Sequence, residues 1–103
     1  MFTVILCTCP DKKNARDIAQ HLVENKLAAC VKIVPEVESF YFWQDAVQHD
    51  SEVQLLIKSK RTLFDEINAA ICSKHSYDVP EVVAIDITQG NAAYLDWLTQ
   101  SVR

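Results

Sequence analysis

The stretch LAACVKIVPEVESFYFWQDAVQHDSEVQLLIKSK, residues 27–60, decides the fold of this chain. It contains two runs rich in β-branched and aromatic residues, joined by a short polar connection. Runs of this kind predict two long strands paired as a hairpin. Pro35 is expected to mark a bulge or an edge position, because proline cannot donate a hydrogen bond to a neighbouring strand.

The far end of this hairpin is apolar on both faces. Because side chains alternate along a strand, Tyr41 and Trp43 are expected on one face, and Phe40 and Phe42 on the other. A solvated antiparallel strand normally keeps one polar face. A small monomer has nothing to cover both faces this far from its core, so we expect another copy of the chain to bury the tip.

The N-terminal part of the chain predicts a strand followed by a helix. Residues 2–9 form an apolar run that is too short for a helix, and its low polarity predicts a central strand covered on both faces. Asp11 can cap the next helix. The apolar stripe of that helix recurs at helical spacing and comprises Ala15, Ile18, Ala19, Leu22 and Val23.

The C-terminal half predicts a helix, a strand and a short final helix. Thr62 and Asp65 resemble a capping pair that opens the first of these helices. Residues 79–88 predict a strand, and Asn91 caps the last helix. The order βαββαβ plus a terminal helix is the ferredoxin-like split β-α-β plan, an α+β fold with an antiparallel sheet and a long central hairpin.

Composition limits the classes of protein to be considered. A length of 103 residues, half of them hydrophobic, predicts a single domain over residues 1–103. The net charge is −4 with no run of Lys or Arg, which argues against a nucleic-acid surface. No stretch is long and apolar enough to span a bilayer or to serve as a signal peptide. Four cysteines without an export signal predict reduced thiols and a cytoplasmic location.

Several phrases together resemble the CutA family, the divalent-cation-tolerance proteins. They are CTCPD at 7–11, ENKLAACVKIVP at 24–35, SFYFWQ at 39–44, EVQLLIKSK at 52–60, YDVPEVVAIDIT at 77–88 and GNAAYLDWL at 90–98. The resemblance covers nearly the whole chain. It implies a ferredoxin-like fold and a tight homotrimer, in agreement with the two-faced aromatic tip. It also implies copper binding and heavy-metal tolerance in bacterial members, and anchoring of a membrane esterase in an animal branch.

The resemblance further implies a copper site. The family's ligands are a Cys on the first strand, which maps to Cys7, and two His in a His-His-Pro-Tyr segment. That segment reads Lys74-His75-Ser76-Tyr77 here, so only His75 remains. A soft thiolate and an imidazole suit copper rather than calcium or magnesium. Protonated Lys74 repels a cation, so a tight site needs a further donor, either Cys9 or a group from a neighbouring subunit.

Packing is the alternative role for these side chains. Cys7 and Cys9 lie two residues apart, on one face of a strand expected to be buried, and free cysteine is among the most buried residue types. Cys30 and Cys72 are expected to be packing residues. For His75, the alternative to a ligand is a solvated histidine in a polar loop.

No enzyme is expected, because the chain has one Gly and no nucleophile motif. A polar cleft between subunits is the remaining candidate site, and its residues are Trp43, Lys58, Tyr77, Asp78 and Glu81. The alternative for these residues is an interfacial ion pair that fixes subunit register, with Trp43 as an interface anchor.

The function favoured by the sequence is therefore a homotrimeric divalent-cation-tolerance protein. It would bind copper or other heavy-metal ions and contribute to metal-ion homeostasis. A trimeric small-molecule sensor or adaptor with ligands in inter-subunit clefts is the alternative. An enzyme using Lys58, Asp78 and Glu81 is the weakest of the three hypotheses.

Overall fold

A computed structural model describes all residues, 1–103. The elements follow in the order β1 (Phe2–Cys9), α1 (Lys12–Glu24), β2 (Cys30–Trp43), β3 (Ala46–Lys60), a 3-10 turn (Arg61–Leu63), α2 (Phe64–Lys74), β4 (Val83–Ile87) and α3 (Ala92–Ser101). The four strands form one antiparallel sheet in the order β2-β3-β1-β4. The predicted α+β, ferredoxin-like architecture is confirmed.

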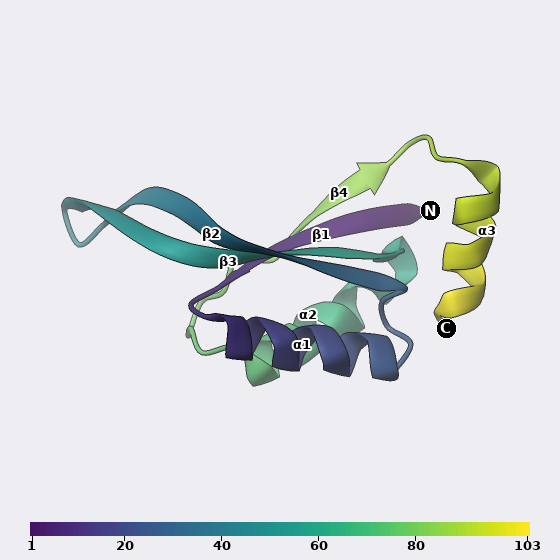
Figure 1. Cartoon of the computed structure of the whole chain (residues 1–103), viewed down its shortest axis with the longest axis horizontal. Helices are drawn as coiled ribbons and strands as arrows, with labels where there is room; N and C mark the ends of the chain where they lie inside the picture. The colour runs from purple at the N-terminus through teal and green to yellow at the C-terminus, as the bar shows by residue number, and fades with distance from the viewer.

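The helices are distributed unevenly about the sheet. α1 and α2 lie side by side under one face, and α3 stands at the end of the sheet opposite the hairpin tip (Figure 1). The β2–β3 hairpin projects well beyond the helices, so the molecule measures 45 × 25 × 22 Å. No helix combines the length and the apolar character needed to cross a membrane.

The core lies between the sheet and helices α1 and α2. Alternate residues of β1, and of β3 from Val53 onward, turn toward the helices and are fully buried or nearly so, which places every second side chain of these stretches in the core. α1 contributes its predicted stripe except for Val23, which is 44% exposed, and α2 contributes Ile67 and Ile71. The main members are Ile5, Cys7, Cys9, Ala15, Ile18, Leu22, Leu55, Ile57, Ile67 and Ile71.

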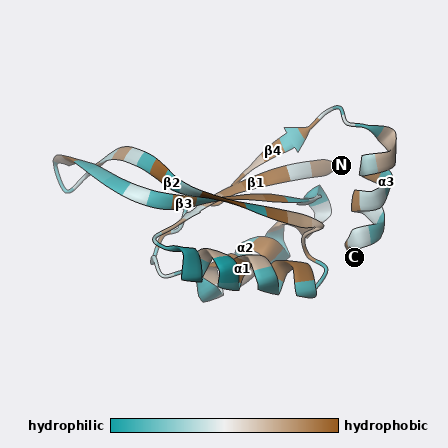
Figure 2. Ribbon diagram, in the orientation of Figure 1, coloured by the Kyte–Doolittle hydropathy of each residue, from teal (hydrophilic) through white to brown (hydrophobic).

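The other face of the sheet is apolar and has no helix of this chain over its middle. β1 is hydrophobic over much of its length (Figure 2), and its central position between β3 and β4 is as predicted. Its second face, however, is only half-buried at Val4 and Leu6. On neighbouring β4, Val83 and Ile85 are 48% and 51% exposed. The prediction that both faces of β1 are covered is therefore wrong for a single chain.

The hairpin contains the bulge predicted at Pro35. The register of β2 against β3 shifts between Val34 and Val37, where β2 has one more residue than its partner, and Glu36 adopts a φ of 60°. An extra residue exchanges the faces of the strand beyond it. Beyond the bulge, Tyr41 pairs with Gln48 and Trp43 pairs with Ala46, and paired residues share one face of the sheet.

The hairpin closes through a two-residue turn at Gln44-Asp45. Trp43 pairs with Ala46, and the two residues between them have φ values of 51° and 61°. Two positive φ angles are the requirement of a type I′ turn, which matches the twist of the flanking strands. The aromatic side chains that precede the turn are highly exposed, 68% for both Phe40 and Phe42.

Helix capping follows the prediction at two of three positions. The Asp11 side chain accepts from the Asn14 amide at 2.8 Å, and the Asn91 side chain accepts from the Tyr94 amide at 3.1 Å. The capping pair predicted at Thr62 and Asp65 is wrong. A 3-10 turn occupies Arg61–Leu63, so α2 begins at Phe64 without a side-chain cap.

The predicted strand at 79–88 is too long at its start. The observed β4 begins at Val83, opposite Leu6, and ends at Ile87, opposite Phe2. Val79 is 85% exposed and Pro80 has no amide hydrogen, so this part of the chain does not extend the ladder. Within the ladder, Val83, Ile85 and Ile87 share one face, as predicted.

Candidate metal centre

Two thiols meet at the end of β1. Cys7 and Cys9 are separated by one residue, so strand alternation turns both toward the helices, and both are fully buried. Pro10 and Asp11 then end the strand and begin α1. The predicted burial of both thiols is confirmed, and their side-by-side placement depends on nothing more than an extended backbone.

The third member of the site comes from the end of α2. His75 is the C-cap of this helix, where its own amide donates to the Ile71 carbonyl at 2.8 Å and its backbone turns to an extended conformation. That turn directs the ring toward β1, where Nε2 lies 2.7 Å from the Thr8 carbonyl oxygen. His75 is therefore anchored to the strand that carries the thiols rather than free in a polar loop.

The imidazole is held at both ring nitrogens. The Tyr77 amide donates to Nδ1 at 3.0 Å, so Nδ1 supplies a lone pair and is unprotonated. The proton of the neutral ring is then on Nε2, which donates it to Thr8. Only the tautomer with a proton on Nε2 satisfies both contacts.

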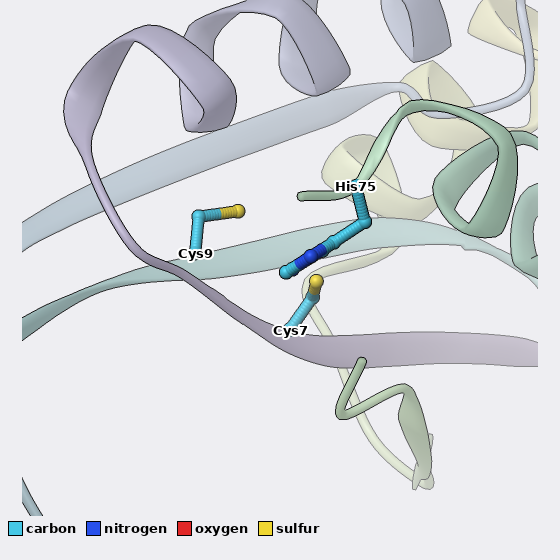
Figure 3. Close-up of side chains that lie close together, drawn as sticks. All are labelled: Cys7, Cys9 and His75. Carbon is cyan, nitrogen blue, oxygen red and sulfur yellow. The ribbon is translucent and has the colours of Figure 1, made fainter. Parts of the chain in front are cut away.

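The three side chains form one cluster. Figure 3 shows the two sulfur atoms and the imidazole turned toward the same space, and their ligand atoms all lie within 4.8 Å of one another. A metal–thiolate bond is about 2.3 Å long and a metal–imidazole bond about 2.0 Å, so two donors to one ion lie at most about 4.6 Å apart. A shift of a few tenths of an ångström would let one ion reach all three.

The two thiols do not share their protons equally. A hydrogen bond from the Cys7 side chain to Cys9, together with burial, raises the pKa of Cys7 above its ordinary value. The same hydrogen bond lowers the pKa of Cys9, against the opposing effect of burial. Cys9 is thus prepared as the first thiolate of the pair, while Cys7 keeps its proton at neutral pH. Thiolate is the form that binds soft metal ions.

The five residues predicted to line a polar cleft do not meet within one chain. Their positions can be compared along β3. Trp43 lies opposite Ala46 near the start of this strand, and the Tyr77 hydroxyl donates to Glu52 at 2.9 Å. Lys58 lies near the other end of the strand. Ala46, Glu52 and Lys58 are successively six positions apart on β3, which is about 20 Å per step in an extended strand. Lys58 instead donates to the Tyr94 hydroxyl of α3 at 3.3 Å.

The two carboxylates of that predicted cleft are exposed. Asp78 and Glu81 lie in the segment between α2 and β4. Glu81 is close enough to Cys7 to contribute a small rise to the pKa of that thiol, although it is not part of the ligand cluster. Burial and the bond to Glu52 raise the pKa of the neighbouring Tyr77.

The remaining cysteines lie outside the cluster. Cys30 is half-buried on β2, which fits its predicted packing role. Cys72 is exposed on α2, so the packing role predicted for it is wrong. It falls off the buried stripe of the helix, which is set by Ile67 and Ile71.

The family resemblance pointed to Cys7 and His75 as candidate ligands, and Cys9 was one of the further donors expected. The alternation Cys-x-Cys on a strand was the signal for Cys9. Sequence reasoning missed the contacts that hold His75, because the Thr8 carbonyl and the Tyr77 amide are backbone groups and every residue type offers them.

Comparisons with known proteins agree on one family. The family model described as CutA1 divalent ion tolerance protein matches residues 3–101. The divalent-cation tolerance protein CutA of Thermus thermophilus is 46% identical over 101 residues, which cover 98% of each chain. A chloroplastic CutA 1 protein of Oryza sativa is 44% identical over 100 residues, which cover 97% of this chain. The chain spans only about half, 56%, of that plant protein's length.

Solved structures give the same result. The divalent cation tolerance protein of Thermus thermophilus superimposes with a TM-score of 0.97 at 45% identity, covering 100% of both chains. CutA1 from Oryza sativa superimposes with a TM-score of 0.97 at 43% identity, covering 99% of this chain and 94% of the plant chain. The likeness therefore includes the projecting hairpin and the terminal helix.

Proposed function

The chain belongs to the CutA1 divalent ion tolerance protein family, and from this premise we propose that it binds copper or another soft metal ion as a homotrimer. In this role it contributes to metal-ion homeostasis in the cytoplasm. The proposal is for a binding protein and not an enzyme. The single observation that carries it is the cluster of Cys7, Cys9 and His75.

The donor set supports copper, and Cu(I) in particular. Two thiolates and one imidazole are soft and borderline ligands, which favour Cu(I) over magnesium, calcium or manganese. Cys7 and Cys9 are fully buried and His75 is half-buried, so a bound ion would be largely shielded from water and from competing ligands. Cys9 would bind as the thiolate that forms first, Cys7 would give up its proton, and His75 would give up at least the hydrogen bond that it accepts from the Tyr77 amide.

Two features support the homotrimer. The hairpin tip exposes Phe40, Tyr41, Phe42 and Trp43 on both of its faces. The helix-free face of the sheet also exposes Val83 and Ile85 beside the half-buried side chains of β1. Exposed apolar surface of this extent marks an interface in a soluble protein. Copies of the chain are the partner that the family resemblance implies.

The cytoplasmic location is supported by the thiols. All four cysteines are free, and the two in the cluster need to remain reduced in order to bind metal. The alternative function, a small-molecule sensor or adaptor, depends on a cleft between subunits, since its predicted residues do not meet within one chain.

The test is a competition titration for Cu(I) with a chromophoric chelator, performed on reduced protein. We expect wild-type protein to remove one Cu(I) per chain from the chelator. Cys7→Ser and Cys9→Ser should each weaken binding by at least about 100-fold, since loss of a group that merely supports a ligand already costs 10–100-fold. Cys72→Ser is the matched control and should bind as wild type does. Equal affinity in all four proteins, or none in wild type, would overturn the proposal.

A further inference from the structure

One buried side chain joins the two halves of the metal centre. Asn14 lies in the first turn of α1 and is only 9% exposed. Its amide nitrogen Nδ2 donates to the Lys74 carbonyl at 3.0 Å, and its Oδ1 accepts from the Ser76 amide at 3.3 Å. The carboxamide thus bonds the chain immediately before and immediately after His75.

These bonds fix the course of the backbone at the point where His75 leaves the helix. The Lys74 carbonyl belongs to the last turn of α2, where carbonyl groups lack partners within the helix. Asn14 satisfies that carbonyl from α1, and Asp11 in turn caps α1 through the backbone amide of Asn14. The thiol-bearing end of β1 leads through Pro10 directly into this cap. We call the two hydrogen bonds of the Asn14 side chain the clamp. Through the clamp and the Asp11 cap, the thiol-bearing end of β1 is connected to the backbone on both sides of His75.

We propose that Asn14 is a positioning residue of the metal centre, holding His75 within coordination range of Cys7 and Cys9. The inference rests on the proposed metal-binding function and adds a residue that touches no ligand atom. Asn14 contacts only backbone groups at positions 74 and 76, so it acts whatever side chains stand there. The arrangement tolerates Lys74 where the family pattern has its first histidine.

The clamp depends on an amide hydrogen at position 76. The family pattern His-His-Pro-Tyr has proline at this position, and proline cannot donate to Asn14. Ser76 supplies the missing donor in this chain. The backbone amide at position 76 and Asn14 therefore act together, and replacement of Asn14 by Ala or of Ser76 by Pro should loosen the ring of His75.

The first experiment is a double-mutant cycle on Cu(I) affinity, measured by competition with bicinchoninate. Asn14→Ala should weaken binding about tenfold, the lower end of the range for groups that support a ligand. In a His75→Ala background the same substitution should change affinity by less than about twofold, because the ligand it positions is gone. Asn91→Ala, which removes the cap of α3 far from the site, is the matched control for a general loss of stability and should bind as wild type does.

The second experiment uses metal-free protein, so it does not depend on copper binding. Long-range proton–nitrogen NMR spectra should show the His75 ring of wild type in one tautomer, with the proton on Nε2. Both Asn14→Ala and Ser76→Pro should show averaging of the two ring nitrogens. The residue before position 76 permits Ser76→Pro, because His75 already has φ −73° and ψ 144°, a conformation allowed before proline.

The outcomes separate the two proposals. Wild-type protein that binds no Cu(I) refutes the metal function, while the NMR result still decides whether Asn14 holds His75. An unchanged tautomer in Asn14→Ala overturns the positioning role. A tenfold loss of affinity in both the wild-type and the His75→Ala backgrounds also overturns it, because a purely structural effect would act equally in both.

Discussion

A metal ion could bind His75 only if the ring gave up a hydrogen bond that it makes in this structure. Its Nδ1 accepts from the Tyr77 amide and its Nε2 lies on the Thr8 carbonyl, so neither nitrogen has a free lone pair. Coordination through Nδ1 takes the lone pair that Tyr77 uses. Coordination through Nε2 moves the ring proton to Nδ1, where it faces the Tyr77 amide hydrogen. On either route the bond to Tyr77 is lost.

Metal loading should therefore release the Tyr77 amide. We expect its hydrogen exchange to accelerate about fivefold or more when Cu(I) binds, the equivalent of about 1 kcal/mol for one hydrogen bond. Exchange resolved by NMR measures this directly. The Asn14 amide, which donates to Asp11 at 2.8 Å, is the internal control and should not change. Unaltered exchange at Tyr77 in a protein whose His75 is shown to be a ligand would refute the tautomer assignment.

Copper affinity should also depend on pH. The pKa of Cys7 is raised by its hydrogen bond to Cys9 and by burial, so at neutral pH it is a thiol whose proton must leave when the metal binds. Below that pKa, affinity for Cu(I) should rise with pH by about tenfold per pH unit for each proton released. Titrations over about two pH units, with the chelator's own protonation taken into account, measure the slope. A flat profile would mean that Cys7 is already ionised or does not bind.

At the scale of elements, helix ends distinguish the two lower helices. α1 has a side-chain cap from Asp11, whereas α2 begins after a 3-10 turn with no side-chain cap. Asp11→Ala should therefore lower the free energy of unfolding by about 1 kcal/mol. Thr62→Ala, at an exposed position of the 3-10 turn, should change it by less than about 0.5 kcal/mol. Denaturant unfolding at one fixed protein concentration compares the two, and an equal loss in both variants would show that Thr62 caps α2 in solution.

The elements that sequence predicts best are those whose pattern is local. Short runs of β-forming residues located β1 and the hairpin, and helical spacing located α1, because each of these signals lies within the element itself. The start of β4 was missed, since Val79 is apolar yet remains exposed where β1 offers no partner. Pro80 was the local signal against the longer strand.

The site was predictable only in part for the same reason. Cys7 and Cys9 lie two residues apart on one strand, so the alternation of side chains along β1 is enough to predict that they share a face. His75 reaches Thr8 across 67 residues, and Asn14 reaches Ser76 across 62. Contacts over such separations depend on how α1 and α2 pack, and no short-range pattern encodes them. The family resemblance supplied His75, but not the groups that hold it.

At the scale of the whole molecule, the bulge at residues 34–37 decides which side chains each face of the hairpin offers. Without its extra residue, Tyr41 and Trp43 would exchange faces with Phe40 and Phe42. Both faces of the tip would still be aromatic without the extra residue. The bulge therefore decides only which two of the four aromatic side chains lie on each face. Under the homotrimer proposal, each face meets a different surface of the neighbouring copies.

Assembly can be tested at the tip. Native mass spectrometry of wild type should show three times the chain mass of 11.7 kDa. Phe42→Glu and Trp43→Glu, on opposite faces, should each weaken association by about 2 kcal/mol or more, the cost typical of losing an interface hot spot, and shift the protein toward monomer. Val23→Glu, at a 44% exposed valine on α1, is the control and should leave the trimer intact. A monomeric wild-type protein would contradict the homotrimer proposal.

The turn at the end of the hairpin has a practical consequence for protein engineering. Gln44 and Asp45 both hold a positive φ that side chains with a Cβ adopt at a cost of roughly 1 kcal/mol each. Replacing Gln44-Asp45 by Asn-Gly, the pair most favoured in type I′ turns, should raise the free energy of unfolding by about 1 kcal/mol, measured by denaturant melts; a loss of stability would show that the turn is not of this type. The substitution leaves every aromatic side chain in place. The tip could then be preorganised, so that a grafted loop or reporter peptide is displayed on a stiffer stem.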